Sequence, residues 1–85
     1  MKYIFVDESW EDYIYWQKTD KKMLKRINAL IKDITINPLT GMGKPEPLKY
    51  KYSGFWSRRI DNIHRLIYQV KDDEIRIVKY RFHYD

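Results

Sequence analysis

The chain has 85 residues, with 17 Lys and Arg against 12 Asp and Glu and no cysteine. This length allows a single domain over residues 1–85 and excludes a multidomain enzyme. Without cysteine there can be no disulfide framework, thiolate zinc site or iron–sulfur cluster, and two histidines are too few for a structural metal without carboxylate help. We therefore expect a protein of the reducing cytoplasm.

Neither export nor membrane insertion is expected. The N-terminus reaches Asp7 and Glu8 after too few apolar residues for a signal-peptide core of about 7 to 15 residues. The longest apolar run, residues 13–16, is far below the roughly 18 to 20 residues that span a bilayer.

The first half of the chain predicts a short strand over residues 2–6 and then two helices. Residues 9–12 have the Ser-x-x-acid spacing of a helix N-terminus, and Thr19-Asp20 provides the cap of the second helix. Apolar residues recur there at spacings of three and four until Asn37-Pro38, where the proline disfavours helical geometry. The two helices should form a hairpin.

The second half predicts a loop and then three strands. Residues 38–47 hold all three prolines and two of the three glycines, so no regular element is expected there. Beyond Gly54 the apolar pattern alternates with a period of two, which predicts strands over 56–60, 64–70 and from 75 to about 82. Turns are expected near residues 61–62 and 71–73.

The order β-α-α-β-β-β predicts an α+β fold, with the helical hairpin packed on one face of an antiparallel sheet. The other face is then free to be concave and polar. Ser57, Arg59 and Asp61 should share a face, because they alternate along one strand.

Positive charge is concentrated in the middle of the chain. Residues 21–40 carry five basic and one acidic side chain, and residues 41–65 carry six and two. Clustered Lys and Arg favour a polyanion such as nucleic acid, because they displace counterions from phosphates. A solvated helix face plus a basic strand would give the same pattern, and the same two interpretations apply to Lys21, Lys22 and Lys25 on the second helix.

Six polar residues match the roles of one reaction, namely Glu46, Lys49, Arg59, Arg65, His83 and Tyr84. Cleavage of RNA by internal transfer needs a base for the 2′-OH proton, cations for the phosphorane and an acid for the leaving 5′ oxygen. A carboxylate, guanidinium groups and an imidazole fill these roles, so no metal or cofactor is required. Each residue also has a simpler interpretation: a solvated loop carboxylate, surface strand charges, or tail residues.

Several blocks of the sequence resemble the Txe/YoeB family of RelE-like toxins. They are residues 41–49 (GMGKPEPLK), 53–60 (SGFWSRRI), 64–66 (HRL) with Tyr68, the terminal His83-Tyr84 and the opening residues 8–17 (ESWEDYIYWQ), so the resemblance covers essentially the whole chain. Two departures are Asp85 after the His-Tyr pair and the aromatic and basic segment 50–52 (YKY).

The resemblance implies a type II toxin that is a ribosome-dependent endoribonuclease, cutting mRNA in the A site of the 70S ribosome to leave 2′,3′-cyclic phosphate and 5′-hydroxyl ends. Carried over by position, Glu46 would be the general base, His83 the general acid and Arg65 the cation that stabilises the transition state. Lys49 and Arg59 would support the phosphate, and Tyr84 would position or stack on the mRNA. A YefM-like antitoxin, 16S rRNA contacts and a homodimer are also implied.

Two alternatives use the same scaffold without chemistry: a ParE-like toxin that inhibits a topoisomerase, and a nucleic-acid-binding module. The pair Glu46 and His83 discriminates between the classes, because a toxin directed at gyrase has no need of an acid and a base.

Overall fold

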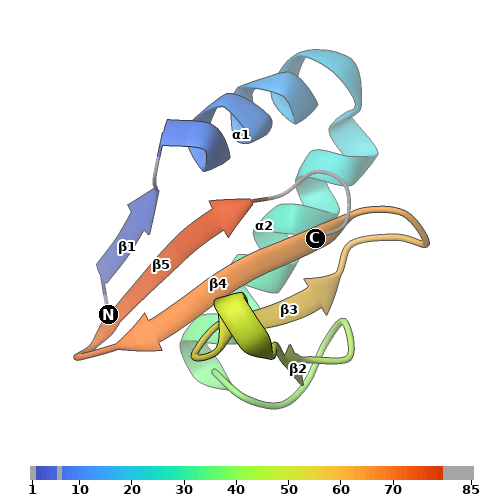
Figure 1. Cartoon of the computed structure of the whole chain (residues 1–85). Helices are drawn as coiled ribbons and strands as arrows, with labels where there is room; N and C mark the ends of the chain where they lie inside the picture. Colours follow the sequence, from blue (N-terminus) through green and yellow to red (C-terminus); the bar gives the residue numbers. More distant parts are fainter. Residues whose placement is uncertain (1, 6, 80–85) are drawn as a thin grey trace.

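The computed structural model describes residues 2–5 and 7–79, so the predicted end of the last strand lies outside the described residues. The elements in chain order are β1 (Lys2–Phe5), α1 (Asp7–Thr19), α2 (Lys21–Ile36), β2 (Glu46–Pro47), the 3₁₀ turn η1 (Tyr50–Tyr52), β3 (Trp56–Arg59), β4 (Arg65–Lys71) and β5 (Glu74–Lys79). This α+β arrangement confirms the predicted fold class (Figure 1). Neither helix in this part of the chain is long and apolar enough to cross a bilayer.

The two helices meet at the cap that the sequence predicts. The Asp20 carboxylate accepts hydrogen bonds from the amides of Lys22 (3.0 Å) and Met23 (3.2 Å), which satisfies donors that the first turn of α2 leaves unpaired. Helix α2 ends before Asn37-Pro38, as expected. The start of α1 was predicted less well, because the helix begins at Asp7 and encloses Ser9 in its first turn.

The five strands lie in the order β1-β5-β4-β3-β2. Three neighbouring pairs are antiparallel, but β1 runs parallel to β5, so the sheet is mixed at the edge where the N-terminal strand joins it. The predicted turn between β4 and β5 is present, with positive φ at Asp72 (50°) and Asp73 (65°), which is typical of a type I′ hairpin turn.

The hydrophobic core lies between the helices and one face of the sheet. Helix α2 contributes three fully buried side chains, Ile27, Leu30 and Ile34, and the sheet meets them with residues that alternate along β4 and β5, namely Leu66, Tyr68, Ile75 and Ile77. Trp16 of α1 and Ile60, just after β3, also belong to the core. This confirms that both helices cover the same face.

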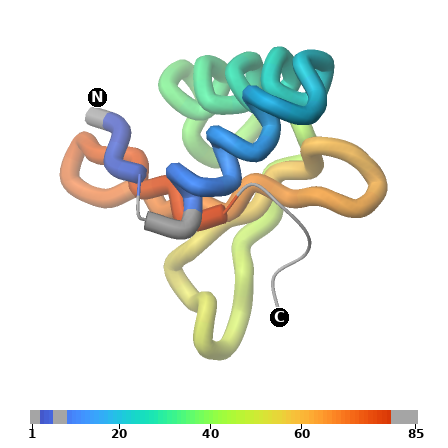
Figure 2. Tube along the Cα trace, turned by 90° about the horizontal axis from the view of Figure 1, so that it is seen from above, coloured from blue at the N-terminus to red at the C-terminus, as the bar shows by residue number. Residues whose placement is uncertain are grey.

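The opposite face of the sheet is the open face. The segment over residues 44–55 projects from this face, on the side of the sheet away from α2 (Figure 2). The prediction that residues 38–47 contain no regular element is wrong at its end, because Glu46 and Pro47 pair with Ser57 and Trp56 as the short edge strand β2. Proline is tolerated there, since an edge strand leaves one side of its backbone unpaired.

Candidate active site on the open face of the sheet

Cross-strand register brings the candidate base and two candidate cations onto the open face. Glu46 pairs with Ser57 across β2 and β3, and Arg59 pairs with Arg65 across β3 and β4. Paired residues point to the same face, and so do residues two apart along a strand. Glu46 is therefore the diagonal neighbour of Arg59, at a separation of roughly 7 to 8 Å between backbones.

The direct pairing of Arg59 with Arg65 is electrostatically unfavourable by itself. Like charges opposite each other in a sheet repel, and their Cβ atoms lie about 4.5 to 5.5 Å apart. A phosphate between the two guanidinium groups would replace this repulsion with two attractions. The pair therefore brings to this face the positive charge that an anion site needs.

Arg65 is held from the turn that precedes its strand. Its Nη1 donates to the carbonyls of Asp61 (2.7 Å) and His64 (3.1 Å). The Asp61 carboxylate in turn accepts the amides of Ile63 (2.8 Å) and His64 (2.6 Å), which closes the turn. Burial opposes ionisation of Asp61, but these amides and the charges of His64 and Arg65 together hold its pKa below its usual value.

Arg59 is held through its backbone instead. Its amide donates to the carbonyl of Gly43 at 2.7 Å, and its carbonyl accepts from Nη2 of Arg26 at 3.3 Å. The side chain itself is exposed. The loop before β2 and helix α2 thus fix the position of Arg59 and leave its guanidinium available to a ligand.

A pocket of about 310 Å³ adjoins this surface and is lined by Glu46, Pro47, Lys49 and Tyr50. The Glu46 side chain is exposed. The pocket therefore places a carboxylate, an ammonium group and an aromatic ring around one opening.

Tyr50 was not among the predicted site residues. Its side chain is 93% exposed and its backbone has a φ of 58°, which is uncommon for a bulky residue. The signal in the sequence was the segment Tyr50-Lys51-Tyr52, in which Lys51 lies 5.2 Å from the Tyr52 ring centroid. An aromatic ring at this rim can stack on a base.

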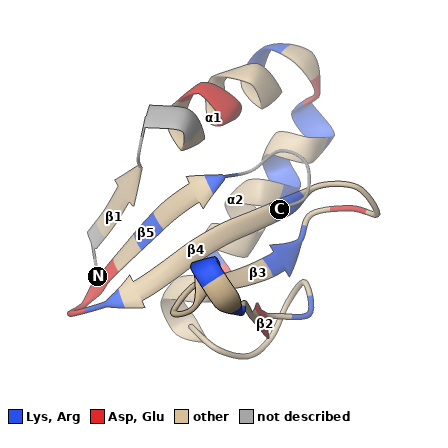
Figure 3. Ribbon diagram, viewed as in Figure 1, with Lys and Arg blue, Asp and Glu red and all other residues tan. Residues whose placement is uncertain are grey.

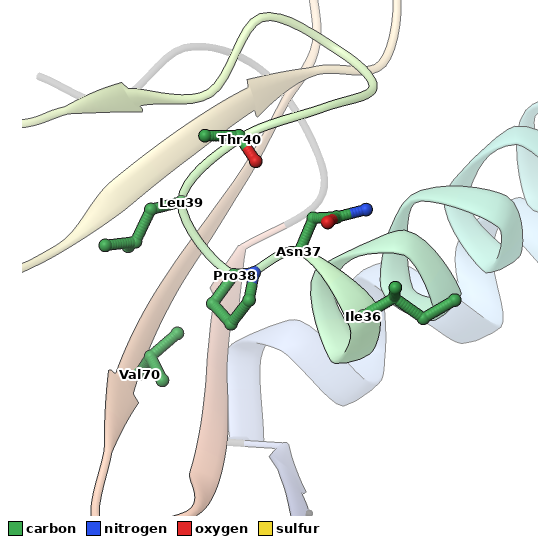
Figure 4. A pocket seen from close by; sticks show the side chains of 6 residues that line it. All are labelled: Ile36, Asn37, Pro38, Leu39, Thr40 and Val70. Atoms are coloured by element: carbon green, nitrogen blue, oxygen red, sulfur yellow. The ribbon is translucent and has the colours of Figure 1, made fainter.

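A second pocket, of about 510 Å³, contains none of the predicted site residues. It is apolar and is lined by Ile36, Asn37, Pro38, Leu39, Thr40 and Val70, where the chain leaves α2 (Figure 4). Val70 belongs to the core-facing side of β4, so this pocket lies away from Glu46.

Comparison with known proteins assigns the chain to a family. Residues 5–84 match the family model described as YoeB-like toxin of bacterial type II toxin-antitoxin system. A relative named Toxin YoeB from Escherichia coli (strain K12) is 58% identical over 84 residues, which cover 99% of this chain and 100% of the relative. The chain belongs to the YoeB-like toxin family.

Solved structures agree with this membership. A YoeB/ParE toxin from Agrobacterium tumefaciens superposes on this YoeB-like toxin with a TM-score of 0.97 at 44% identity, covering 99% of this chain and 100% of the other. YoeB of Staphylococcus aureus was solved as a dimer and in a heterotetrameric YoeB–YefM complex. Both superpose with a TM-score of 0.92 at 47% identity, over 99% of this chain and 98% of theirs.

Not every predicted site residue of the YoeB-like toxin meets on the open face. Lys21, Lys22 and Lys25 are exposed at the start of α2, on the helical side of the molecule, whereas other basic residues lie on β3, β5 and η1 (Figure 3). His83 and Tyr84 lie outside the described residues. The positions of the candidate acid and of the candidate stacking residue therefore stay predictions.

Proposed function

We propose that this YoeB-like toxin is a metal-independent endoribonuclease that acts in the cytoplasm, an mRNA interferase that cuts A-site mRNA on the 70S ribosome and so inhibits translation. The observation that carries the proposal is the arrangement of Glu46 diagonal to the directly paired Arg59 and Arg65 on an exposed face. A carboxylate beside two cations supplies the base and the positive charge that this reaction needs.

In the proposed reaction, Glu46 removes the proton of the 2′-OH, and the freed oxygen forms a bond to the neighbouring phosphorus. Arg65 and Arg59, supported by Lys49, stabilise the negative charge that grows on the phosphorane oxygens. His83 protonates the 5′ oxygen as its bond to phosphorus breaks. The products are a 2′,3′-cyclic phosphate and a 5′-hydroxyl end, while Tyr84 stacks on the mRNA.

The proposed partners are a YefM-like antitoxin, a second copy of the chain, and the 70S ribosome with its 16S rRNA. The antitoxin and the homodimer are supported by the Staphylococcus aureus structures, in which YoeB was solved with YefM and as a dimer. The rRNA contact is supported by the exposed Lys21, Lys22 and Lys25 on α2, because clustered ammonium groups attract a phosphate backbone.

Primer extension on a defined mRNA, with and without programmed 70S ribosomes, tests the function. We expect discrete A-site cuts only with ribosomes, and a loss of cutting in His83→Ala. Glu46→Gln removes the base with little change in shape and should lower the cutting rate by roughly 10² to 10⁴-fold. Glu11→Gln is the matched control, because it changes an exposed carboxylate on α1 and should cut normally.

The other outcomes have distinct meanings. Absence of cutting by the folded toxin under both conditions would overturn the nuclease proposal and direct attention to a supercoiling assay with gyrase. Equal cutting of naked RNA would indicate a general ribonuclease, and equal cutting by Glu46→Gln would remove Glu46 from the base role.

A further inference from the structure

Arg58, the neighbour of Arg59 on β3, is a fully buried arginine whose five N–H donors all have partners. Its Nε donates to the Tyr68 hydroxyl (3.0 Å), and its Nη1 to Asp33 Oδ2 (2.5 Å) and the Met42 carbonyl (3.1 Å). Its Nη2 donates to the carbonyls of Asn37 and Thr40, the latter at 2.9 Å. We call Arg58, Asp33 and Tyr68, with the carbonyls they bind, the arginine clasp.

The arginine clasp holds the loop over residues 37–43, which has no regular secondary structure. Besides the three carbonyls bound by Arg58, the Tyr68 hydroxyl donates to the Pro38 carbonyl (2.8 Å) and the Met42 amide donates to Asp33 Oδ2 (2.9 Å). Burial raises the pKa of Tyr68, so its hydroxyl keeps the proton that it donates. Four of the seven loop residues, Asn37, Pro38, Thr40 and Met42, thus form hydrogen bonds to the clasp.

The loop passes so close to the clasp and to α2 that glycine is required at two of its positions. A Cβ on Gly41 would lie 2.5 Å from Asp33 Oδ2, and one on Gly43 would lie 2.8 Å from Leu30 Cδ2. Both residues also have positive φ, 106° and 83°, which side chains disfavour. Two constraints therefore define the path of the loop: close contacts at Gly41 and Gly43, and the backbone conformation of these two residues.

The same loop leads directly into the strand that bears Glu46. The Gly43 carbonyl accepts the amide of Arg59, and three residues later Glu46 pairs with Ser57. Strand β2 has only two residues, so its position depends on how its ends are held. Beyond it, the Leu48 amide donates to the Phe55 carbonyl at 2.9 Å.

We propose that Arg58 is a positioning residue, which fixes Glu46 relative to Arg59 by holding the 37–43 loop from the core side of the sheet. The inference rests on the proposed function for its catalytic consequence. Stability alone does not explain the residue, because well-packed apolar side chains in place of a buried ion pair are often neutral or stabilising. A buried guanidinium group that donates five hydrogen bonds instead defines one conformation of the loop.

The test is a double-mutant cycle between Arg58→Met and Glu46→Gln, measured as single-turnover cleavage in preformed toxin–ribosome complexes. We expect Arg58→Met to lower the saturated rate by roughly 10 to 100-fold, the effect of misplacing a catalytic group by about 1 Å. The half-saturating toxin concentration should change little. In the Glu46→Gln background, Arg58→Met should have no further effect, and an equal effect in both backgrounds would overturn the proposal.

Two variants separate positioning from loss of folding. Ile75→Ala removes core volume on β5, a strand that contributes no residue to the clasp, and should lower the unfolding midpoint while leaving the saturated rate unchanged at temperatures where the toxin is folded. If Arg58→Met does not fold, Arg58→Lys takes its place, because it keeps the charge but loses the fork. A saturated rate equal to that of the unmodified toxin in the folded Arg58 variant would overturn the proposal.

Amide hydrogen exchange gives a readout that does not depend on cleavage. The Arg59 amide, bonded to the Gly43 carbonyl, should exchange faster in the Arg58 variant than in Ile75→Ala at matched global stability. Unchanged protection of this amide would overturn the positioning role even if the toxin cleaves mRNA. If the unmodified toxin does not cleave mRNA, the proposed function fails. Faster exchange of the Arg59 amide in the Arg58 variant would still show that Arg58 holds the loop.

Discussion

Arg58 and Arg59 are consecutive residues on one strand, yet they lie in opposite environments. Arg58 points into the core, where it is fully buried and every donor has a partner, whereas Arg59 points to the open face and its guanidinium is exposed. The alternation of a strand is enough to produce this difference. The same side chain therefore fixes a loop on one face and is available to an anion on the other.

The largest effect on stability is expected at Arg58. Arg58→Ala removes the charged partner of the Asp33 carboxylate and the side-chain donor of three loop carbonyls, so we expect a loss of about 3 to 5 kcal/mol in the free energy of unfolding. Urea unfolding followed by circular dichroism measures it. A loss below about 0.5 kcal/mol, the usual range for surface substitutions, would show that Arg58 contributes no more to stability than an exposed residue.

Arg59→Ala should reduce cleavage with little change in stability. Because the side chain is exposed and faces Arg65, we expect stability to change by less than about 0.5 kcal/mol. Cleavage should fall by roughly 10 to 100-fold, since a hydrogen bond to a charged group contributes about 1.5 to 3 kcal/mol. Arg76→Ala is the matched control, because Arg76 is also exposed on a strand, but its Nε lies 3.7 Å from Oε2 of Glu74. Equal loss of cleavage in both variants would argue against a specific role for Arg59.

Low pH should weaken the arginine clasp. The Met42 amide, followed by Arg58, holds the pKa of Asp33 below its ordinary value despite partial burial. A lowered pKa contributes stability that is present above the unfolded-state value and is lost as pH falls through the folded-state value. Asp33→Asn should therefore be less stable than the unmodified toxin at neutral pH.

That difference should shrink as the pH falls. Thermal unfolding from neutral pH down to about pH 3 measures the trend for both proteins. A difference that stays constant over the whole range would show that ionisation of Asp33 does not stabilise the clasp.

The smallest effect is expected on the helical side of the molecule. Lys25→Glu should weaken ribosome binding and reduce the salt dependence of the affinity by a slope of about one, with the cleavage rate of bound toxin unchanged. Cosedimentation with ribosomes at several salt concentrations measures this, with Lys32→Glu as an exposed control farther along α2. Unchanged binding would remove the start of α2 from the proposed rRNA contact.

Local signals in the sequence were sufficient for most of the fold. The Asp20 cap, the stop at Asn37-Pro38 and the turn at Asp72-Asp73 depend on neighbouring residues, and the structure confirms each of them. The parallel pairing of β1 with β5 joins the two ends of the described chain, and no local pattern reports such a partner.

The candidate site was predicted in part for the same reason. Alternation along β3 put Ser57 and Arg59 on one face, and the structure confirms this. The short strand β2 was not predicted, because the surrounding prolines indicate a loop. The arginine clasp was not predicted either, because it joins Asp33 and Arg58, which are 25 positions apart, through a loop without periodicity. Tyr50 belongs to the aromatic and basic segment 50–52 that stands out in the sequence, but only the structure shows that it lines the pocket with Glu46.

The most direct test of the central claim is to identify the RNA ends that the toxin leaves on ribosome-bound mRNA. Attack by the 2′-OH, assisted by Glu46 and the paired arginines, predicts a 2′,3′-cyclic phosphate on one fragment and a 5′-hydroxyl on the other. Mass spectrometry of both fragments at early times distinguishes these ends. A 3′-hydroxyl with a 5′-phosphate would mean that water attacks from the other side, and would contradict the account.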